Sequence, residues 1–155
     1  MADYLALYVF VRTDLPSMTP GKAQAHSGHA ANHFVYNYYI NNNSGTHLSN
    51  VEDWMKQANG FGTQINLKGA WQDVMKAVDD SDIDGFPTGR VIDPTYPYVV
   101  NNEILELIRP TMHTLPPVQM ADGNYMCFRR ETTAAYVFGY KDALQSYVGK
   151  FPLHP

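Results

Sequence analysis

Hydrophobic and polar positions follow strand and helix periods in different parts of this chain. The segment 4–12 contains an unbroken apolar run, which predicts a central strand covered on both faces. Residues 63–68 alternate between apolar and polar side chains, as a half-exposed strand does. Residues 70–79 have the spacing of an amphipathic helix. Its predicted apolar face consists of Ala70, Val74, Ala77 and Val78.

Capping signals mark two helices in the first half of the chain. Thr19 is a good N-cap residue, and Pro20 suits the first helical position. A run of asparagine, serine and glycine at 41–45 ends this first helix. Ser49 and Glu52 have the spacing of a capping box at the start of the second. The predicted helices are 20–41 and 49–58.

Turn residues divide the second half of the chain. Asp93-Pro94 is typical of a turn and ends a strand predicted at 90–92. Pro110 closes the next helix, and the polar, proline-bearing stretch 110–124 predicts a loop or excursion. The other predicted elements are a helix at 100–109, a last strand or hairpin at 125–129 and 133–139, and a short helix at 141–149.

Strands that alternate with helices imply an α/β fold. We predict one domain over 1–155, with a mixed β-sheet of about four strands and helices on both faces. A chain of 155 residues is long enough to bury roughly 70% of its unfolded surface. The sequence shows no internal repeat and no low-complexity tract.

Charge and composition narrow the class of protein. The formal net charge of −4 argues against a strongly basic nucleic-acid-binding protein, although Arg129-Arg130 is a local basic pair. No apolar run approaches the roughly 20 residues needed to cross a bilayer, and the N-terminus lacks a basic leader. The single cysteine, Cys127, excludes an internal disulfide and argues against a cysteine-based zinc site. We therefore expect a cytoplasmic protein that does not associate with membranes.

The segment from Arg12 to Ala30 concentrates the candidate chemistry. The first strand delivers Arg12 and Asp14 to a proline-marked loop. The helix after this loop begins with a lysine and three histidines offset by four, three and four residues, so these side chains share one face. They are Lys22, His26, His29 and His33. The small residues around them would let a substrate or another backbone come close.

The sequence leaves three interpretations of these histidines open. They pack at the boundary of helix and sheet, or they bind a metal together with a carboxylate such as Asp14 or Asp93. In the third interpretation they form an acid/base site at the helix N-terminus. There Lys22 and the free N–H groups would hold an anion or an oxyanion, while His29 transfers protons.

The same segment resembles type II peptidyl-tRNA hydrolases. That family carries a strand ending in R-x-D-L, a glycine-lysine pair and a helix with A-Q-x-x-H-A. Arg12–Leu15, Gly21-Lys22 and His29-Ala30 occupy these positions in order. Asp93 fits the family's aspartate at the end of a later strand, and 133–139 is similar to its threonine-led strand near the C-terminus.

The chain also departs from the family pattern. His26 stands where the family has glutamine, and Pro97 where it has threonine, with Thr95 close by as a substitute. Tyr140 follows Gly139 in place of the family's G-x-G-P ending. The segments 94–108 and 110–124 are unlike compact members. Such divergence is typical of phage-encoded relatives.

The resemblance implies hydrolysis of the ester that joins a peptidyl group to the tRNA 3′ end. It implies a general base, an oriented imidazole and an oxyanion stabiliser. The catalytic candidates are Lys22, His29, Asp93 and His26. The substrate-binding candidates are Arg12, Asp14, Thr95 and Thr133. Four of these residues also have plain structural interpretations, as a loop brace, a turn starter, a strand-end charge and a solvated lysine. They are Asp14, Asp93, Arg12 and Lys22.

The implied enzyme needs no metal and no organic cofactor. Its expected partner is tRNA or a tRNA-linked peptide, and a homodimer is allowed. The rival hypothesis is a non-catalytic binding protein on the same scaffold that recognises a nucleotide, a small ligand or a partner protein. A third hypothesis is a metal-dependent hydrolase that uses His26, His29 and His33.

Overall fold

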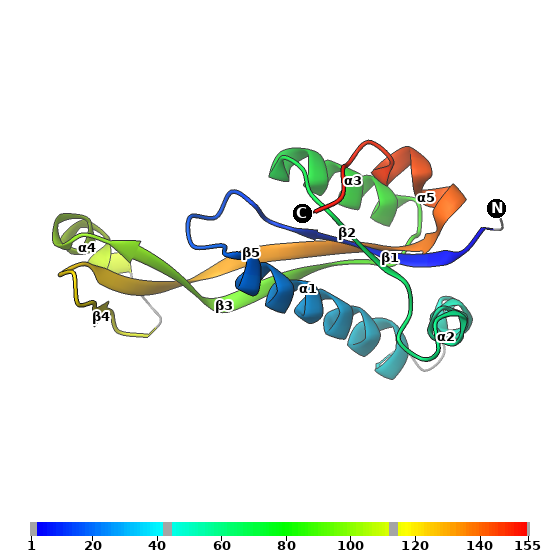
Figure 1. The fold of residues 1–155 in the computed structure, drawn as a ribbon, viewed down its shortest axis with the longest axis horizontal. Coiled ribbons are helices and arrows are strands. Elements are labelled where there is room, and N and C mark those ends of the chain that lie inside the picture. Colours follow the sequence, from blue (N-terminus) through cyan, green and yellow to red (C-terminus); the bar gives the residue numbers. More distant parts are fainter. Residues whose placement is uncertain (1–2, 42–44, 112–114, 155) are drawn as a thin grey trace.

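A mixed five-stranded sheet forms the centre of the fold in this computed structural model, which describes residues 3–41, 45–111 and 115–154 (Figure 1). The strands are β1 (Leu5–Val11), β2 (Gln64–Leu67), β3 (Thr88–Val100), β4 (Val118–Gln119) and β5 (Tyr125–Tyr140). The helices are α1 (Pro20–Val35), α2 (Leu48–Gln57), α3 (Trp71–Ile83), α4 (Asn102–Ile108) and α5 (Lys141–Val148), with a π-helical segment η1 (Tyr36–Ile40) and a 3-10 turn η2 (Arg109–Thr111).

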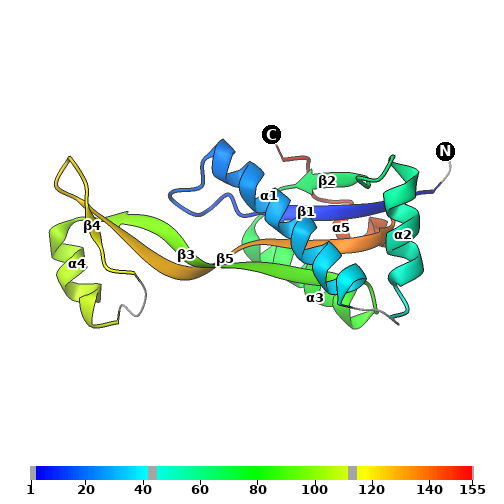
Figure 2. The ribbon, with the colours of Figure 1, turned by 90° about the horizontal axis from the view of Figure 1, so that it is seen from below.

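The strand order is β2-β1-β5-β3, with β4 paired to β5 away from this path. β1 runs parallel to β2 and antiparallel to β5, and β5 is antiparallel to β3. Helices α1 and α2 lie on one face of the sheet, and α3 and α5 lie on the other (Figures 1 and 2). The predicted mixed α/β sheet with helices on both faces is therefore confirmed.

Strand β1 supplies the centre of two cores, one on each face of the sheet. Every residue from Leu5 to Val11 is buried. Leu5, Leu7 and Val9 pack with residues of α1 and α2, whereas alternate residues such as Tyr8 and Phe10 pack with α3 and α5. Alternation of side chains across a strand explains how one apolar run serves both faces, as the sequence predicted.

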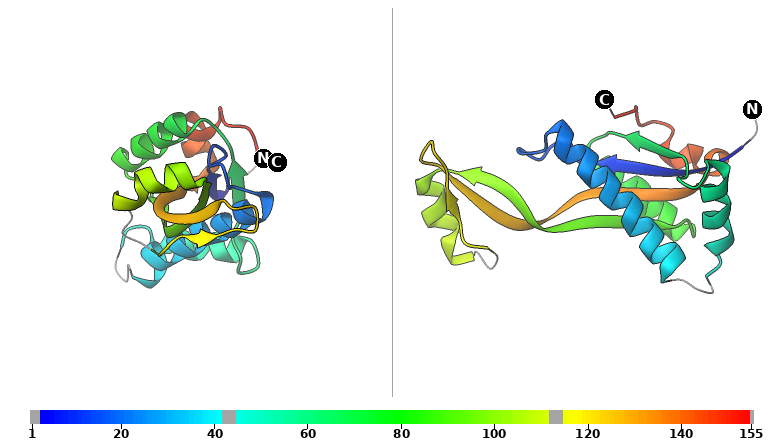
Figure 3. Two further views of the ribbon diagram at one scale, coloured as in Figure 1. Left: turned by 90° about the vertical axis from the view of Figure 1, so that its left-hand side faces the viewer. Right: turned by 60° about the horizontal axis from the view of Figure 1, so that its bottom comes forward.

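Strands β3 and β5 continue beyond the body of the molecule as a twisted ribbon that carries α4 and β4 (Figures 1 and 3). We call this projection, residues 97–111 and 115–129, the arm. The prediction that Asp93-Pro94 ends a strand is wrong, because β3 runs on to Val100. One register shift lies between Val91 and Ile92 and another between Asp93 and Tyr96, so the ladder omits Pro94 and Thr95. The segments predicted at 125–129 and 133–139 are likewise one strand, β5.

The helix predictions were correct in position and less accurate at their ends. Thr19 caps α1 as predicted, since its hydroxyl accepts a hydrogen bond from the Lys22 N–H at 3.3 Å. The predicted capping box is wrong, because α2 begins at Leu48 and its N-cap residue, His47, makes no side-chain cap. The long first helix ends at Val35 and continues as η1. Parts of two predictions, 42–44 and 112–114, lie outside the described residues.

The third helix and the predicted loop also differ from expectation. α3 starts at Trp71 and extends to Ile83, beyond the predicted 70–79. Of its predicted apolar face, Val74, Ala77 and Val78 are buried, but Ala70 is the exposed N-cap. The segment 110–124 contains the end of η2 and the short strand β4, which pairs with β5.

We expect Gly89→Ala to destabilise the fold. Gly89 pairs with Tyr136 across β3 and β5, and a Cβ there would overlap the Tyr136 ring and hydroxyl. Overpacking of this kind costs about 1–3 kcal/mol. The matched control is Gly28→Ala in α1, where a Cβ meets nothing within 4 Å. A helical alanine there should stabilise by roughly 0.5–1 kcal/mol. Urea unfolding of both variants checks the pair, and equal midpoints would contradict it.

Candidate functional site

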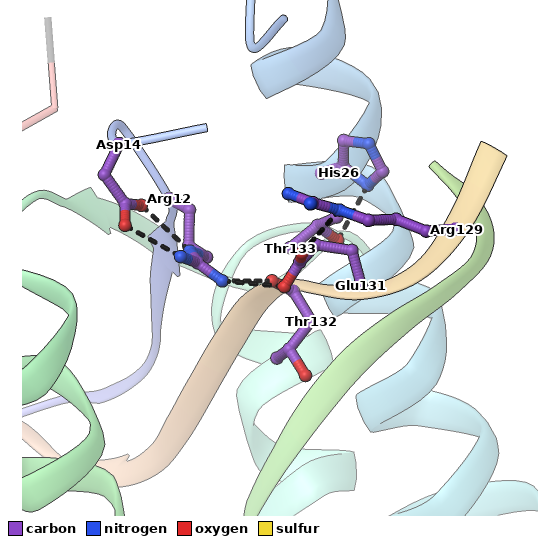
Figure 4. Close-up of polar contacts among 7 residues, drawn as sticks. All are labelled: Arg12, Asp14, His26, Arg129, Glu131, Thr132 and Thr133. Carbon is purple, nitrogen blue, oxygen red and sulfur yellow. Dashed lines mark hydrogen bonds and ion pairs between the residues drawn. The ribbon is translucent and has the colours of Figure 1, made fainter. Parts of the chain in front are cut away.

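His26 lies at the centre of a polar cluster between α1 and the start of the arm. Its Nδ1 is 3.0 Å from the Thr133 hydroxyl of β5 (Figure 4). Its Nε2 is 3.9 Å from Asp93 Oδ2 on β3. Only 5% of His26 is exposed, and Thr133 is fully buried. Three elements that are far apart in sequence therefore bring a histidine, a hydroxyl and a carboxylate together.

The local structure explains why Asp93 reaches this histidine. The register shift after Asp93 leaves Pro94 and Thr95 out of the ladder with β5. Asp93 Oδ1 accepts a hydrogen bond from the Thr95 N–H at 2.8 Å, with the Thr95 hydroxyl at 3.5 Å. Thr95 thus fixes one carboxylate oxygen and leaves Oδ2 on the side of His26. The sequence indicated a turn at Asp93-Pro94, and the structure has a bulge within a strand there.

Tyr96 and Lys22 complete the cluster. The Lys22 ammonium lies 5.7 Å from the centre of the Tyr96 ring, and the His26 ring lies 5.9 Å from it. Tyr96 is fully buried, and its hydroxyl has no hydrogen-bond partner among the described residues. A buried hydroxyl without a partner costs free energy, so it marks a position where a water or a substrate atom would be stabilised.

Burial lowers the pKa of His26 below its usual value of 6.5. The neighbouring His29 and Lys22 lower this pKa further, while Asp93 opposes them. Near neutral pH the imidazole is therefore uncharged, which is the form that accepts a proton. A neutral histidine with one nitrogen hydrogen-bonded and the other beside a carboxylate has the arrangement of a general base.

We expect the protein to lose stability as the pH falls below about 6.5, because burial also lowers the pKa of His33. In this range the unfolded chain binds protons at His26 and His33 that the folded chain does not. The free energy of unfolding is thus fully present above pH 6.5 and falls with decreasing pH, by at most about 1.4 kcal/mol per pH unit for each histidine. Urea unfolding at pH 7.5 and 5.5 measures the slope.

The double variant His26→Gln/His33→Gln should flatten this pH dependence. His29→Gln is the comparison variant: His29 is exposed on the same helix and lowers the pKa of His26 less than burial does, so most of the slope should remain. A slope in the double variant equal to that of the wild type would show that other groups cause the effect.

The other two helix histidines occupy different surroundings. His29 is exposed, and its ring meets the His26 ring edge-on at 5.3 Å. His33 Nδ1 lies 2.8 Å from the hydroxyl of Tyr136, which is a residue of the core. The residues that the structure describes include no group of three or more histidine, cysteine, aspartate or glutamate side chains that could hold a metal ion. The three histidines thus do not converge on one metal site.

Arg12 and Asp14 form a separate ion-pair network beside the cluster (Figure 4). The Arg12 guanidinium donates two hydrogen bonds to Asp14, at 2.8 and 2.7 Å, and one to Glu131 at 2.9 Å. Glu131 in turn pairs with Arg129 at 3.1 Å. The Arg12 guanidinium holds the pKa of Asp14 below its usual value. Both carboxylates neutralise Arg12, so this arginine has little charge left for a substrate phosphate.

An open cavity of about 580 Å³ lies beside the first turns of α1 and reaches strand β2, which is at the other end of the strand order from β3 and its Asp93. The loop after β1, the first turns of α1, strand β2 and the C-terminal segment enclose it. Its lining includes Arg12, Met18, Ala23, Gln24 and Asn66. The ion-pair network of Arg12 therefore borders both the cavity and the His26 cluster.

The structure brings together five of the eight predicted site residues: Lys22, His26, Asp93, Thr95 and Thr133. It places His29 at the outer edge of the cluster and Arg12 and Asp14 in the adjoining network. Tyr96 was missed because a turn predicted at Asp93-Pro94 hid the continuation of β3. Glu131 was missed because it falls in the gap between the segments predicted at 125–129 and 133–139, and Arg129 was noted only as part of a basic pair. A bulge adds one residue of β3 between Asp93 and Tyr96, so that both side chains lie on the same face of the sheet. Interpreting the same dipeptide as a bulge would therefore have indicated Tyr96 as an inward residue.

The chain matches no family model and has no match among curated proteins. Within the described residues, no helix combines the length and apolarity that a membrane crossing requires.

Proposed function

We propose that this protein hydrolyses an ester that joins a peptidyl or related acyl group to the 3′ end of tRNA. One observation carries the proposal: His26 is buried between the Thr133 hydroxyl and the Asp93 carboxylate, with Lys22 beside it. The resemblance of 12–15 and 21–22 to type II peptidyl-tRNA hydrolases supplies the substrate class. The geometry supports His26 as the general base in preference to the exposed His29.

The surroundings of His26 suit the activation of a water molecule. With the Nδ1 proton donated to Thr133 Oγ1, Nε2 presents its lone pair on the side of Asp93. The separation of 3.9 Å between Nε2 and Asp93 Oδ2 is too long for a direct hydrogen bond and allows one water to contact both. In the proposed reaction this water attacks the acyl carbon while Nε2 accepts its proton.

The attack produces a tetrahedral intermediate with a negatively charged oxygen. The Lys22 ammonium and the positive end of the α1 dipole stabilise this charge. The intermediate collapses when the bond between the acyl carbon and the ribose oxygen breaks, and the imidazolium returns its proton to that oxygen. The products are a free peptide carboxylic acid and a tRNA whose terminal hydroxyl is restored.

Two neighbouring residues support this role of His26 indirectly. Thr95 orients the carboxylate, because its N–H and hydroxyl both approach Asp93 Oδ1. Thr133, which the resemblance implies as substrate-binding, is fully buried and orients the imidazole. We therefore assign positioning roles to both threonines.

The chain that we propose to bind tRNA has a net charge of −4, so its contacts to phosphate depend on local cations. Lys22 lies in the cluster, and Arg129 lies on the strand beside it with its guanidinium over the Tyr98 ring at 4.8 Å. Few phosphate contacts imply a modest decrease of tRNA affinity with salt, because each neutralised phosphate adds about 0.9 to the logarithmic slope.

The test is release of the acyl group from a model peptidyl-tRNA by the purified protein. Wild-type protein should release it, and Lys22→Ala, His26→Ala and Asp93→Ala should each lose most of the rate. Thr95→Ala should lose less, since Asp93 keeps its place on β3. Full activity in Lys22→Ala, His26→Ala and Asp93→Ala would refute the site assignment.

The second candidate is a non-catalytic binding protein on the same scaffold that recognises a nucleotide, a small ligand or a partner protein. The observation in its favour is the burial of His26, which is only 5% exposed. The absence of both acyl release and tRNA binding would support it. Acyl release by the wild type that is lost in His26→Ala would exclude it.

A further inference from the structure

We propose that two copies of this chain associate through their arms, which pack face to face about a two-fold axis. The interface is the side of the arm that carries Val99, Met126 and Val118, and we call it the open face. Tyr96 and Arg129, on the side of the His26 cluster, alternate with these residues along β3 and β5. The open face therefore points away from the cluster, and the inference does not depend on the proposed hydrolysis.

Strand pairing in the arm places the three apolar side chains in one row. Met126 of β5 has a partner on each side, because it pairs with Val99 of β3 and with Val118 of β4. Side chains directly opposite each other in an antiparallel pair lie on the same face of the sheet. The row therefore forms a continuous apolar strip across all three strands of the arm.

The helix of the arm covers the other face. Cys127 and its partner Tyr98 alternate with the strip residues and point away from them. Cys127 is fully buried, and burial raises the pKa of its thiol, although the nearby charge of Arg109 opposes the shift. Arg109 belongs to η2, directly after α4, and Figure 3 shows α4 against one side of the ribbon. On the open face, by contrast, Val99 and Val118 are 50% and 55% exposed.

A contiguous apolar strip on a thin sheet points to an interface. Single exposed apolar side chains are common on monomeric proteins, whereas contiguous ones mark interaction surfaces. A sheet of few strands also needs its apolar face covered to be stable. Helices cover both faces of β5 in the body, but within the described part of the chain one face of the arm stays uncovered. A second sheet packed on this face would supply the missing layer.

The charges at the two ends of the strip identify a second copy as the partner. Asp122 lies in the turn between β4 and β5, and Arg130 lies where β5 enters the body. Each is four residues from Met126, in opposite directions, and both are exposed. Arg130 points to the open face, because it is an even number of residues from Met126 along β5. A two-fold axis through Met126 therefore brings Asp122 of each copy to Arg130 of the other.

The overall charge of the arm disfavours other classes of partner. Nucleic acids and anionic membranes attract surfaces with an excess of basic side chains. The arm as described carries three acidic and two basic side chains, which are Glu103, Glu106, Asp122, Arg109 and Arg129. A surface with both signs of charge around an apolar strip suits a protein partner.

The narrow strip sets the expected strength of the dimer. Three strands about 4.8 Å apart make a small sheet, so the interface buries less than the roughly 800 Å² per partner of a standard complex. We therefore expect a dimer that dissociates in the micromolar range.

The test is sedimentation velocity of the full chain over the micromolar range. Wild-type protein should change from monomer to dimer as its concentration rises. Val118→Asp should raise the dissociation constant about tenfold or more, because it buries an unpaired carboxylate in the interface. Leu107→Asp is the matched control, since it adds the same charge to an exposed leucine on α4, outside the strip, and should leave the dissociation constant unchanged. Circular dichroism checks that both variants are folded.

Exchanging the charges tests the two-fold arrangement itself. Asp122→Arg and Arg130→Asp should each weaken the dimer, because each variant places like charges together at both ends of the strip. A mixture of the two single variants pairs opposite charges at both ends and should associate more tightly than either variant alone. This recovery cannot come from a change in folding, since the same two chains are compared separately and mixed.

Three results would overturn the inference. They are a wild-type chain that remains monomeric throughout the range, a dimer that Val118→Asp leaves unchanged, and a mixture that associates no better than its components. Acyl release enters none of these measurements, so a failure of the proposed hydrolysis leaves the dimer intact and a failure of the dimer leaves the hydrolysis intact.

Discussion

Replacing His26 with alanine is expected to lower the rate of acyl release by about 10²–10⁴-fold, the contribution that a positioned general base makes. The replacement removes the only imidazole in contact with both Thr133 and Asp93 among the described residues. The loss should appear in kcat, because the proton transfer occurs in the chemical step. Single-turnover release from a model peptidyl-tRNA is the direct measurement.

Two companion variants make this prediction specific. His29→Ala should retain activity within a few-fold, since His29 is exposed and touches the cluster only through the His26 ring. His26→Gln introduces the glutamine of the type II peptidyl-tRNA hydrolase pattern and preserves a polar partner for Thr133. Full activity in His26→Gln would show that the imidazole is not the base, and loss in His29→Ala alone would transfer the role to His29.

The pH dependence of the rate should report the same group. Burial lowers the pKa of His26, so the active, uncharged form persists to lower pH than in a free imidazole. The rate should therefore decline only below pH 6.5, as His26 becomes protonated.

Replacing Phe34 with alanine is expected to lower the free energy of unfolding by about 3–5 kcal/mol. Phe34 is fully buried and lies at the centre of an aromatic cluster between α1, α2 and β5. Its ring is 4.6 Å from that of Phe138, 5.3 Å from Trp54 and 5.6 Å from Tyr136, measured between ring centres. Removing it leaves a cavity that three large rigid rings cannot fill.

The loss of stability expected for Phe34→Ala is large enough to be measured by equilibrium unfolding. A domain of this kind is stable by roughly 5–15 kcal/mol, so the variant would lose a large part of its stability. Urea unfolding gives the free energy directly. Phe61→Ala is the matched control, because the same atoms are removed from a side chain that is 74% exposed. Its effect should stay within about 0.5 kcal/mol, and equal losses in the two variants would contradict the assignment of the core.

The sequence predicted those parts of the fold whose signals are local and agree with one another. The apolar run of β1 indicated a central strand, and Thr19 with Pro20 located the start of α1. The arm was not predicted, because Asp93-Pro94 has the composition of a turn and a bulge within a strand cannot be distinguished from it locally. Pairing with β5, more than 30 residues later, decides between the two.

The sequence identified the candidate residues on the first helix but not their burial. Helical spacing placed Lys22, His26, His29 and His33 on one face, but it could not show which of them is buried. That depends on the tilt of α1 over the sheet, which packing of Ala30 and Phe34 against β1 and β5 determines. The departure from the family pattern, His26, lies at the centre of the cluster, and the matching histidine, His29, lies at its edge.

The continuous strands β3 and β5 also determine where backbone hydrogen bonds open most easily. At about 3.3 Å per residue, the 16 residues of β5 span roughly 50 Å, from the helix-covered body into the arm. In the body the strand is buried on both faces, whereas the arm exposes apolar side chains such as Val99 and Leu107. Amide hydrogens exchange faster where less apolar surface is buried, so exchange should accelerate along each strand toward the arm. Asp93 and Tyr96 lie at this transition, with slowly exchanging backbone on one side and readily opening backbone on the other.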